Sequence, residues 1–82
     1  MTKLIGEPVT TYAENDSILT AFIWRKRLYR VSEVLNWWRE PSDWWDDKSI
    51  RYFVLVNARN SSEGTYELYR IGESWFLQRV LD

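Results

Sequence analysis

The sequence predicts a mainly β fold, a small half-open antiparallel barrel or curled meander of five to six strands with one short helix. Three observations support this. Short segments rich in β-branched and aromatic residues recur along the 82 residues. Short polar connections separate them. The chain also has six tryptophans, and a flat sheet would leave many of its aromatic rings in water, so we expect the sheet to curl.

The first half of the chain contains two expected strands and a basic hairpin. Residues 7–13 (EPVTTYA) suit a pleated strand that starts near a proline. Residues 18–24 (ILTAFIW) are apolar on both faces, which is typical of a central strand. Residues 25–27 then predict a tight hairpin into a strand at 28–31, although they include neither glycine nor asparagine for the positive φ of a two-residue turn.

Residues 32–39 (SEVLNWWR) are the one segment with helical spacing. Their apolar side chains stand at i, i+1 and i+4, a serine can cap the amino end, and a proline follows two residues after the segment. The pattern predicts a short helix. On that helix Trp37 projects away from the face that carries Val34 and Trp38.

The second half predicts a loop or short turn at residues 42–49 and three more strands, at residues 51–57, 65–71 and 75–81. A hairpin loop is expected at 60–64. A tight turn at 71–74 is expected to use Gly72 in a positive φ conformation. The arginines of these strands are expected on the barrel exterior, against aromatic rings (Arg51, Arg70 and Arg79).

The composition indicates one domain over residues 1–82 and argues against several functions. The chain has no cysteine and no histidine, so it lacks thiolate metal ligands and the usual general base near neutral pH. We therefore expect no enzyme activity, no catalytic residues, no cofactor and no metal. Asp43, Asp46 and Asp47 have a spacing that could gather three carboxylates around Mg²⁺, but a solvated acidic loop is the favoured interpretation.

The charge and hydropathy predict a cytoplasmic protein. No apolar run is long enough to span a bilayer, and the first residues lack the apolar region of a signal peptide. With a net charge of −1, the protein surface as a whole is not attracted electrostatically to nucleic acid or to an anionic membrane. A local basic patch remains compatible with this charge.

The basic hairpin, residues 24–30, is the candidate nucleic-acid site. It places four positive charges within six residues, beside two aromatic rings. Cations can hold a phosphate backbone while a ring stacks on a base, as in single-strand binders without sequence preference. The alternative is that the hairpin is charged for solubility. The candidate residues are Trp24, Arg25, Lys26, Arg27, Tyr29 and Arg30.

Trp37, Trp44 and Trp45 are the candidate partner-binding residues. Neighbouring side chains diverge on a strand or helix, so at least one ring of each tryptophan pair is a candidate for exposure. Exposed aromatic patches mark binding surfaces for proteins, including a second copy of the chain as a homodimer. In the alternative, Trp38 and one ring of the second pair plug an end of the barrel.

The chain also shows an ordered series of aromatic and basic motifs: WRKRLYRV at residues 24–31, VL at 34–35, WW at 37–38 and 44–45, RYFV at 51–54, YELYR at 66–70 and WFL at 75–77. This order resembles a family of small bacterial domains, some of them similar to the C-terminal tail of ImuB-like proteins, the inactive relatives of Y-family DNA polymerases. The resemblance covers about residues 18–82. The chain departs from it in two places: Lys26 replaces a glycine, and Gln78-Arg79 replaces His-Gly.

The resemblance implies an accessory part in DNA damage tolerance by translesion synthesis. The favoured function is therefore a non-catalytic β-module that binds single-stranded DNA, a Y-family polymerase or related repair protein, or both. The alternative is a general protein interaction or self-assembly module without nucleic-acid contact. The near-neutral net charge favours a protein partner, whereas the resemblance favours DNA.

Overall fold

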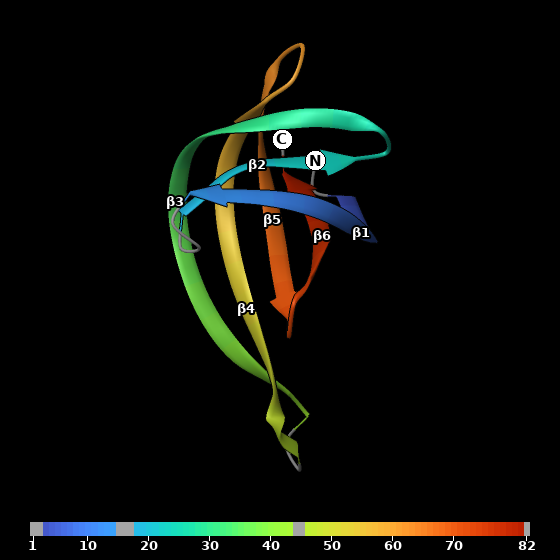
Figure 1. The fold of residues 1–82 in the computed structure, drawn as a ribbon, viewed down its shortest axis with the longest axis vertical. Coiled ribbons are helices and arrows are strands. Elements are labelled where there is room, and N and C mark those ends of the chain that lie inside the picture. Colours follow the sequence, from blue (N-terminus) through green and yellow to red (C-terminus); the bar gives the residue numbers. More distant parts are fainter. Residues whose placement is uncertain (1–2, 15–17, 44–45, 82) are drawn as a thin grey trace.

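The computed structural model describes the backbone of residues 3–14, 18–43 and 46–81, and the side chains of residues 4–14, 19–40 and 50–81. The described residues form six strands joined by short connections (Figure 1). The strands are β1 (Lys3–Glu14), β2 (Ile18–Trp24), β3 (Arg27–Asp43), β4 (Asp46–Arg59), β5 (Glu63–Ile71) and β6 (Ser74–Leu81). The predicted mainly β fold is confirmed.

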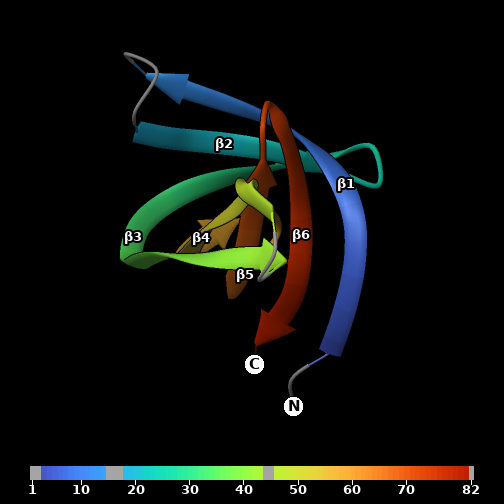
Figure 2. The same ribbon diagram turned by 90° about the horizontal axis from the view of Figure 1, so that it is seen from below.

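The sheet is a closed antiparallel barrel in which each strand pairs with the next and β1 also pairs with β6. The β1 strand achieves this by changing neighbours along its length: residues 3–9 pair with β6 and residues 10–14 with β2 (Figure 2). A bulge between Leu4 and Glu7 includes Gly6, whose φ of 69° suits a residue without Cβ. The barrel is closed where the sequence predicted a half-open one.

The helix predicted at residues 32–39 is wrong, because these residues lie within β3, and the described residues contain no helix. The register of β3 against β4 shifts between Val31 and Glu33 and again between Val34 and Asn36. Each shift inserts one extra residue and breaks the alternation of side chains. As a result Val31, Val34 and Trp37 share one face at intervals of three, a spacing that resembles a helix.

The hairpin between β2 and β3 has both turn residues in the left-handed region. Arg25 has a φ of 52° and Lys26 a φ of 65°. Two positive φ values in a two-residue loop match the twist of the flanking strands, which explains why the turn forms without glycine or asparagine. In the hairpin between β5 and β6, Gly72 has a φ of 61°, as predicted.

The core cluster occupies the part of the barrel that β1 and β2 cover. Phe22 stacks on Tyr29 with ring centroids 5.1 Å apart, and Tyr66 meets both rings edge-on at 5.6 and 5.3 Å. Rings at these separations interact favourably beyond the area they bury. The core cluster also contains Leu19, Val54, Val56, Ala58, Leu68 and Leu77. Because aromatic side chains are large, these few residues are enough to fill the interior of a small barrel.

A second set of rings, the outer aromatic row, crosses the outer face of β3 to β6. Trp38 stacks on Phe53 at 5.3 Å, Phe53 meets Tyr69 at 5.7 Å, and Tyr69 stacks on Phe76 at 5.1 Å. These four residues are partners in the strand register. The alternative interpretation expected Trp38 to plug an end of the barrel. This is wrong, because Trp38 lies on the outer face of β3, away from the interior.

Candidate functional site

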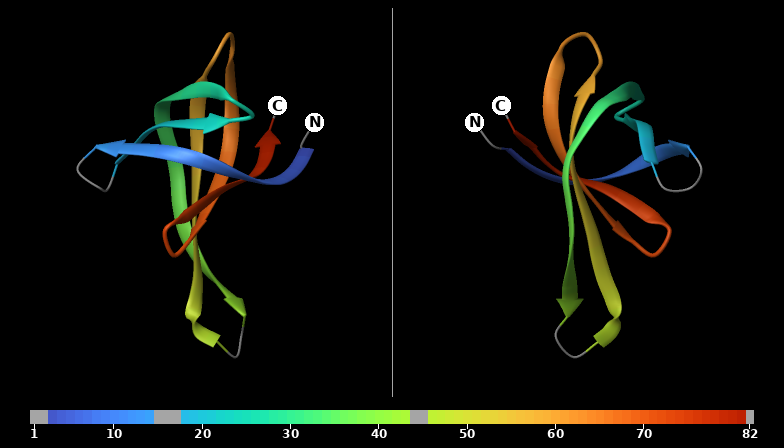
Figure 3. Two further views of the ribbon diagram at one scale, coloured as in Figure 1. Left: turned by 45° about the vertical axis from the view of Figure 1, so that its right-hand side comes forward. Right: turned by 90° about the vertical axis from the view of Figure 1, so that its left-hand side faces the viewer.

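The candidate site is a cavity of about 760 Å³ on the inner face of the barrel, here called the mouth. The lower parts of β3 and β4 extend past the crossing strands β1 and β2 (Figure 3). Pockets that bind small ligands typically enclose roughly 300–1,000 Å³ and are mostly apolar. The lining residues are Ala13, Leu19, Val34, Trp37, Tyr52, Val54, Arg70, Gly72, Glu73 and Trp75, together with Phe53, whose ring belongs to the outer aromatic row.

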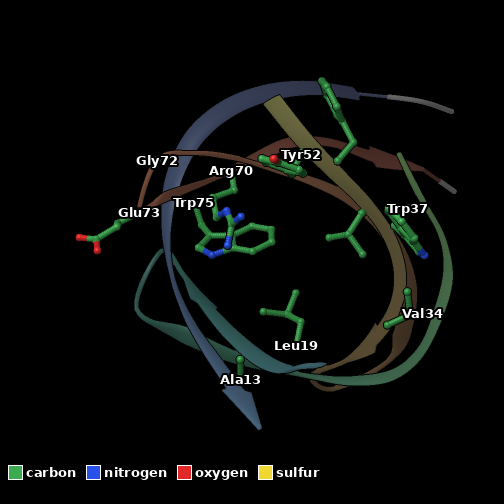
Figure 4. A pocket seen from close by; sticks show the side chains of 11 residues that line it. Ala13, Leu19, Val34, Trp37, Tyr52, Arg70, Gly72, Glu73 and Trp75 are labelled. Carbon is green, nitrogen blue, oxygen red and sulfur yellow. The ribbon is translucent and has the colours of Figure 1, made fainter. Parts of the chain in front are cut away.

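One wall of the mouth holds an arginine between two aromatic rings. The strand register makes Tyr52, Arg70 and Trp75 successive cross-strand neighbours on β4, β5 and β6. The Arg70 guanidinium carbon lies 4.9 Å from the Tyr52 ring centroid and 5.9 Å from the Trp75 ring centroid (Figure 4). Such contacts are favourable cation–π interactions. The predicted exterior position of Arg70 is wrong, because Arg70 shares the inward face of β5 with Tyr66 and Leu68.

The Arg70 side chain has unused hydrogen-bonding capacity. Its Nε is buried and has no hydrogen-bond partner. Within the described residues, no carboxylate forms an ion pair with it. The other two arginines of the late strands do lie on the exterior, where Arg51 sits over the Tyr69 ring at 5.3 Å and Arg79 Nε lies 3.0 Å from Glu67 Oε2.

The opposite wall is apolar and comes from β3. Val34 and Trp37 face the cavity from this side (Figure 4). Trp37 is 71% exposed, and its backbone N–H donates to Asn36 Oδ1 at 2.9 Å. The predicted separation of Val34 from Trp37 is wrong because the bulge between Val34 and Asn36 rotates both side chains onto the same face. Trp37 lies opposite Arg70 and Trp75 across open space.

The rest of the predicted partner-binding set falls outside the described residues. This applies to Trp44 and Trp45, and also to the side chains of Asp43, Asp46 and Asp47. Across the part of the chain that the structure describes, no group of three acidic, histidine or cysteine residues is arranged to hold a metal ion. The groups in the mouth that could contact a ligand are therefore mainly aromatic rings and one cation, Arg70.

At the basic hairpin, Arg25 and Trp24 are both engaged by an acid that sequence reasoning did not identify. The Trp24 indole N–H donates to Glu7 Oε1 at 3.0 Å, and Arg25 forms a bidentate pair with Glu7, with its shortest contact at 2.7 Å. The Arg25 guanidinium also lies 4.6 Å from the Trp24 ring centroid. Glu7 lies on β1, so only the register of distant strands could have revealed this contact.

These hydrogen bonds shift the pKa values of both charged partners, Glu7 and Arg25. The bonds from Arg25 and then from Trp24 lower the pKa of Glu7 from 4.5 to about 2. The same bond to Glu7 raises the pKa of Arg25. Glu7 therefore stays ionised throughout the usual pH range, and it neutralises one of the four cations predicted to contact phosphate.

The remaining hairpin residues do not converge on one surface. Tyr29 is only 9% exposed and stacks in the core cluster, so its ring is not free to stack on a base. Lys26, Arg27 and Arg30 are exposed. Arg27 and Arg30 are three residues apart on one strand and therefore point to opposite faces.

Comparison with known proteins identifies one family. A family model described as "Domain of unknown function (DUF6504)" matches residues 1–82. Neither a curated protein nor a solved structure matches the chain. The residues with described structure also include no helix that is long and apolar enough to cross a membrane.

Proposed function

We propose, for a chain that belongs to the DUF6504 family, a non-catalytic interaction function in which the mouth binds a partner protein. The supporting observation is the 71% exposed Trp37 ring, which faces Arg70 and Trp75 across a cavity of about 760 Å³. Contiguous exposed apolar surface marks interaction sites, and Trp37 adjoins the exposed Val34 at this cavity.

The arrangement resembles the anchors of known protein interfaces. Binding energy at interfaces concentrates in a few tryptophan, tyrosine and arginine residues set in pockets. Trp37, Tyr52, Arg70 and Trp75 supply all three residue types within one cavity. The absence of histidine from the sequence fits a binding function better than acid–base catalysis near neutral pH.

The test is capture of partners from the cytoplasm of the source cell, with and without DNA damage. The full chain carries an affinity tag, and bound proteins are identified by mass spectrometry. We expect Trp37→Ala to lose the specific partners, because the substitution removes the exposed ring from the mouth. A Y-family polymerase or related repair protein among them would support the damage-tolerance function implied by the motif order.

The matched control is Leu4→Ala. Leu4 is 70% exposed, almost as much as Trp37, but lies on β1 outside the mouth. It should retain every partner of the wild-type chain. Capture of the same proteins by Trp37→Ala and wild type would contradict the proposed function.

A second candidate function is binding of single-stranded DNA at the basic hairpin. It is favoured by Lys26, Arg27 and Arg30, which are exposed and have no ion-pair partner within the described residues. Each phosphate contact contributes roughly 0.7 to the slope of log affinity against log salt for single strands. A Lys26→Gln, Arg30→Gln double variant should therefore lower that slope, measured by fluorescence anisotropy with an oligonucleotide. An affinity that does not change with salt would exclude this function.

A further inference from the structure

We infer that the mouth recognises an acidic peptide segment, with a carboxylate on Arg70 and a neighbouring apolar side chain against Trp37. This inference rests on the proposed function and specifies the chemistry of the partner. It follows from three features of the cavity: an arginine without an acidic partner, an apolar wall opposite it, and a shortage of further cations.

Arg70 supplies the charge complementarity. Its guanidinium lies between the rings of Tyr52 and Trp75, which hold it at 4.9 and 5.9 Å from their centroids. A guanidinium restrained in this way presents its remaining N–H groups in a fixed plane, which matches the two oxygens of a carboxylate. The buried Nε has no hydrogen-bond partner among the described residues, so no acceptor of the described chain already engages the guanidinium at that atom.

The apolar wall defines the neighbour of the carboxylate. Val34 and Trp37 face Arg70 from β3, and Leu19 lies between the two walls (Figure 4). A ligand that binds Arg70 within this cavity would lie near these side chains. An aliphatic or aromatic residue next to the acid would remove the exposed Trp37 ring from water.

The cation content of the mouth favours a peptide over a nucleic acid. Arg70 is the one cation among the described lining residues, and Glu73 adds a negative charge at the rim. Nucleic-acid sites track a phosphate backbone with several cations. A single arginine in an aromatic cavity suits one carboxylate beside an apolar group.

The experiment uses the full chain labelled with ¹⁵N and three probes. The first is a capped pentapeptide, glycine-leucine-glutamate-leucine-glycine. The second has glutamine in place of glutamate, and the third is a short oligothymidylate. NMR titration follows the indole N–H signals of Trp37 and Trp75 and the Nε–H signal of Arg70.

We expect the glutamate peptide to bind roughly tenfold more tightly than the glutamine peptide, as a charge-assisted hydrogen bond would give. Both indole signals should move, and the Arg70 Nε–H signal should move with the glutamate peptide only. The shift of the Arg70 Nε–H signal is measured on the wild-type chain, so this test remains valid even if a substituted chain fails to fold. Arg70→Gln should abolish the tenfold preference. Arg59→Gln, which removes an exposed arginine outside the mouth, should leave it unchanged.

Three results would overturn the inference: equal affinity for the two peptides, an Arg70 Nε–H signal that the glutamate peptide does not move, or tighter binding of the oligothymidylate at the same indoles. Its failure is distinct from failure of the proposed function. Loss of the glutamate preference while Trp37→Ala still abolishes partner capture refutes only the acidic ligand. Retention of all partners by Trp37→Ala refutes the binding function itself.

Discussion

The core cluster and the mouth use the same residue types on the same inner face of one barrel, with opposite results. In the core cluster, Phe22 points inward from β2 and is fully buried, and Tyr29, which stacks on it, is 9% exposed, because β1 and β2 cover this part of the barrel. In the mouth, Trp37 is 71% exposed, because β3 continues beyond that cover. Aromatic content alone therefore does not separate core from surface. The extent to which β1 and β2 cover the barrel decides which aromatic rings are buried.

This difference predicts that substitutions in the two regions affect different properties. Substitutions in the core cluster should lower the free energy of unfolding. Substitution of the exposed Trp37 in the mouth should change binding and leave that free energy almost intact. The predictions below test this separation in order of decreasing effect on stability.

The largest effect is expected for Phe22→Ala. Phe22 is fully buried and contacts Tyr29 and Tyr66, so truncation leaves a cavity beside these two rings. Such substitutions cost about 3–5 kcal/mol. Equilibrium unfolding in urea, followed by tryptophan fluorescence, measures the loss. A cost below about 1 kcal/mol would mean that the core cluster is no better packed than the mouth.

A smaller effect that depends on pH is expected for Glu7→Gln. Its carboxylate has a pKa lowered to about 2 in the folded chain, against 4.5 ordinarily. A lowered pKa in the folded state stabilises the fold above the unfolded value, so the contribution is complete above pH 4.5 and declines as the pH falls towards 2. The difference in thermal midpoint between wild type and Glu7→Gln should follow this window. A difference that is constant from pH 6 to pH 2 would contradict the assignment.

A modest gain in stability is expected for Lys26→Gly. Lys26 has a φ of 65°, and a left-handed conformation costs a residue with Cβ roughly 1–2 kcal/mol. Glycine removes this cost but loses roughly 0.5–1 kcal/mol of chain entropy, so a net gain of about 0.5 kcal/mol is expected. Urea unfolding measures it. Destabilisation would show that the Lys26 side chain makes a contact worth more than the backbone cost.

The smallest effect on stability is expected for Trp37→Ala. A side chain that is 71% exposed removes little apolar area from water, so the free energy of unfolding should stay within about 0.5 kcal/mol of wild type. Urea unfolding under the conditions used for Phe22→Ala makes the comparison direct. A loss above about 2 kcal/mol would place Trp37 in the core and remove the contrast between the two regions.

Much of the fold could be predicted from the sequence, since most strands carry local signals. The bounds of β2, Ile18–Trp24, match the prediction, and Gly72 adopts the expected positive φ. The failure lies in β3, where two bulges put Val31, Val34 and Trp37 at intervals of three. A bulge depends on pairing with another strand, so its spacing in one sequence cannot be distinguished from a helical turn.

The candidate site was less predictable. The exposure of one ring in the first tryptophan pair was expected from the divergence of adjacent side chains, and Trp37 is the exposed one. The stacking of Arg70 between Tyr52 and Trp75 was not, because it requires the register of three strands. The pairing of Glu7 with Arg25 was missed for the same reason, since it joins residues 18 positions apart. Long-range register, unlike local pattern, cannot be read from neighbouring residues.

The double pairing of β1 has a consequence for how the chain is synthesised. Residues 3–9 pair with β6, so the barrel closes only when the last strand is available. During synthesis β6 leaves the ribosome after the other five strands, and residues 3–9 of β1 have no β6 partner to pair with until then. Contacts between such distant residues also slow folding, because a long loop must close before they form. We therefore expect the closed barrel to form only after β6 has left the ribosome.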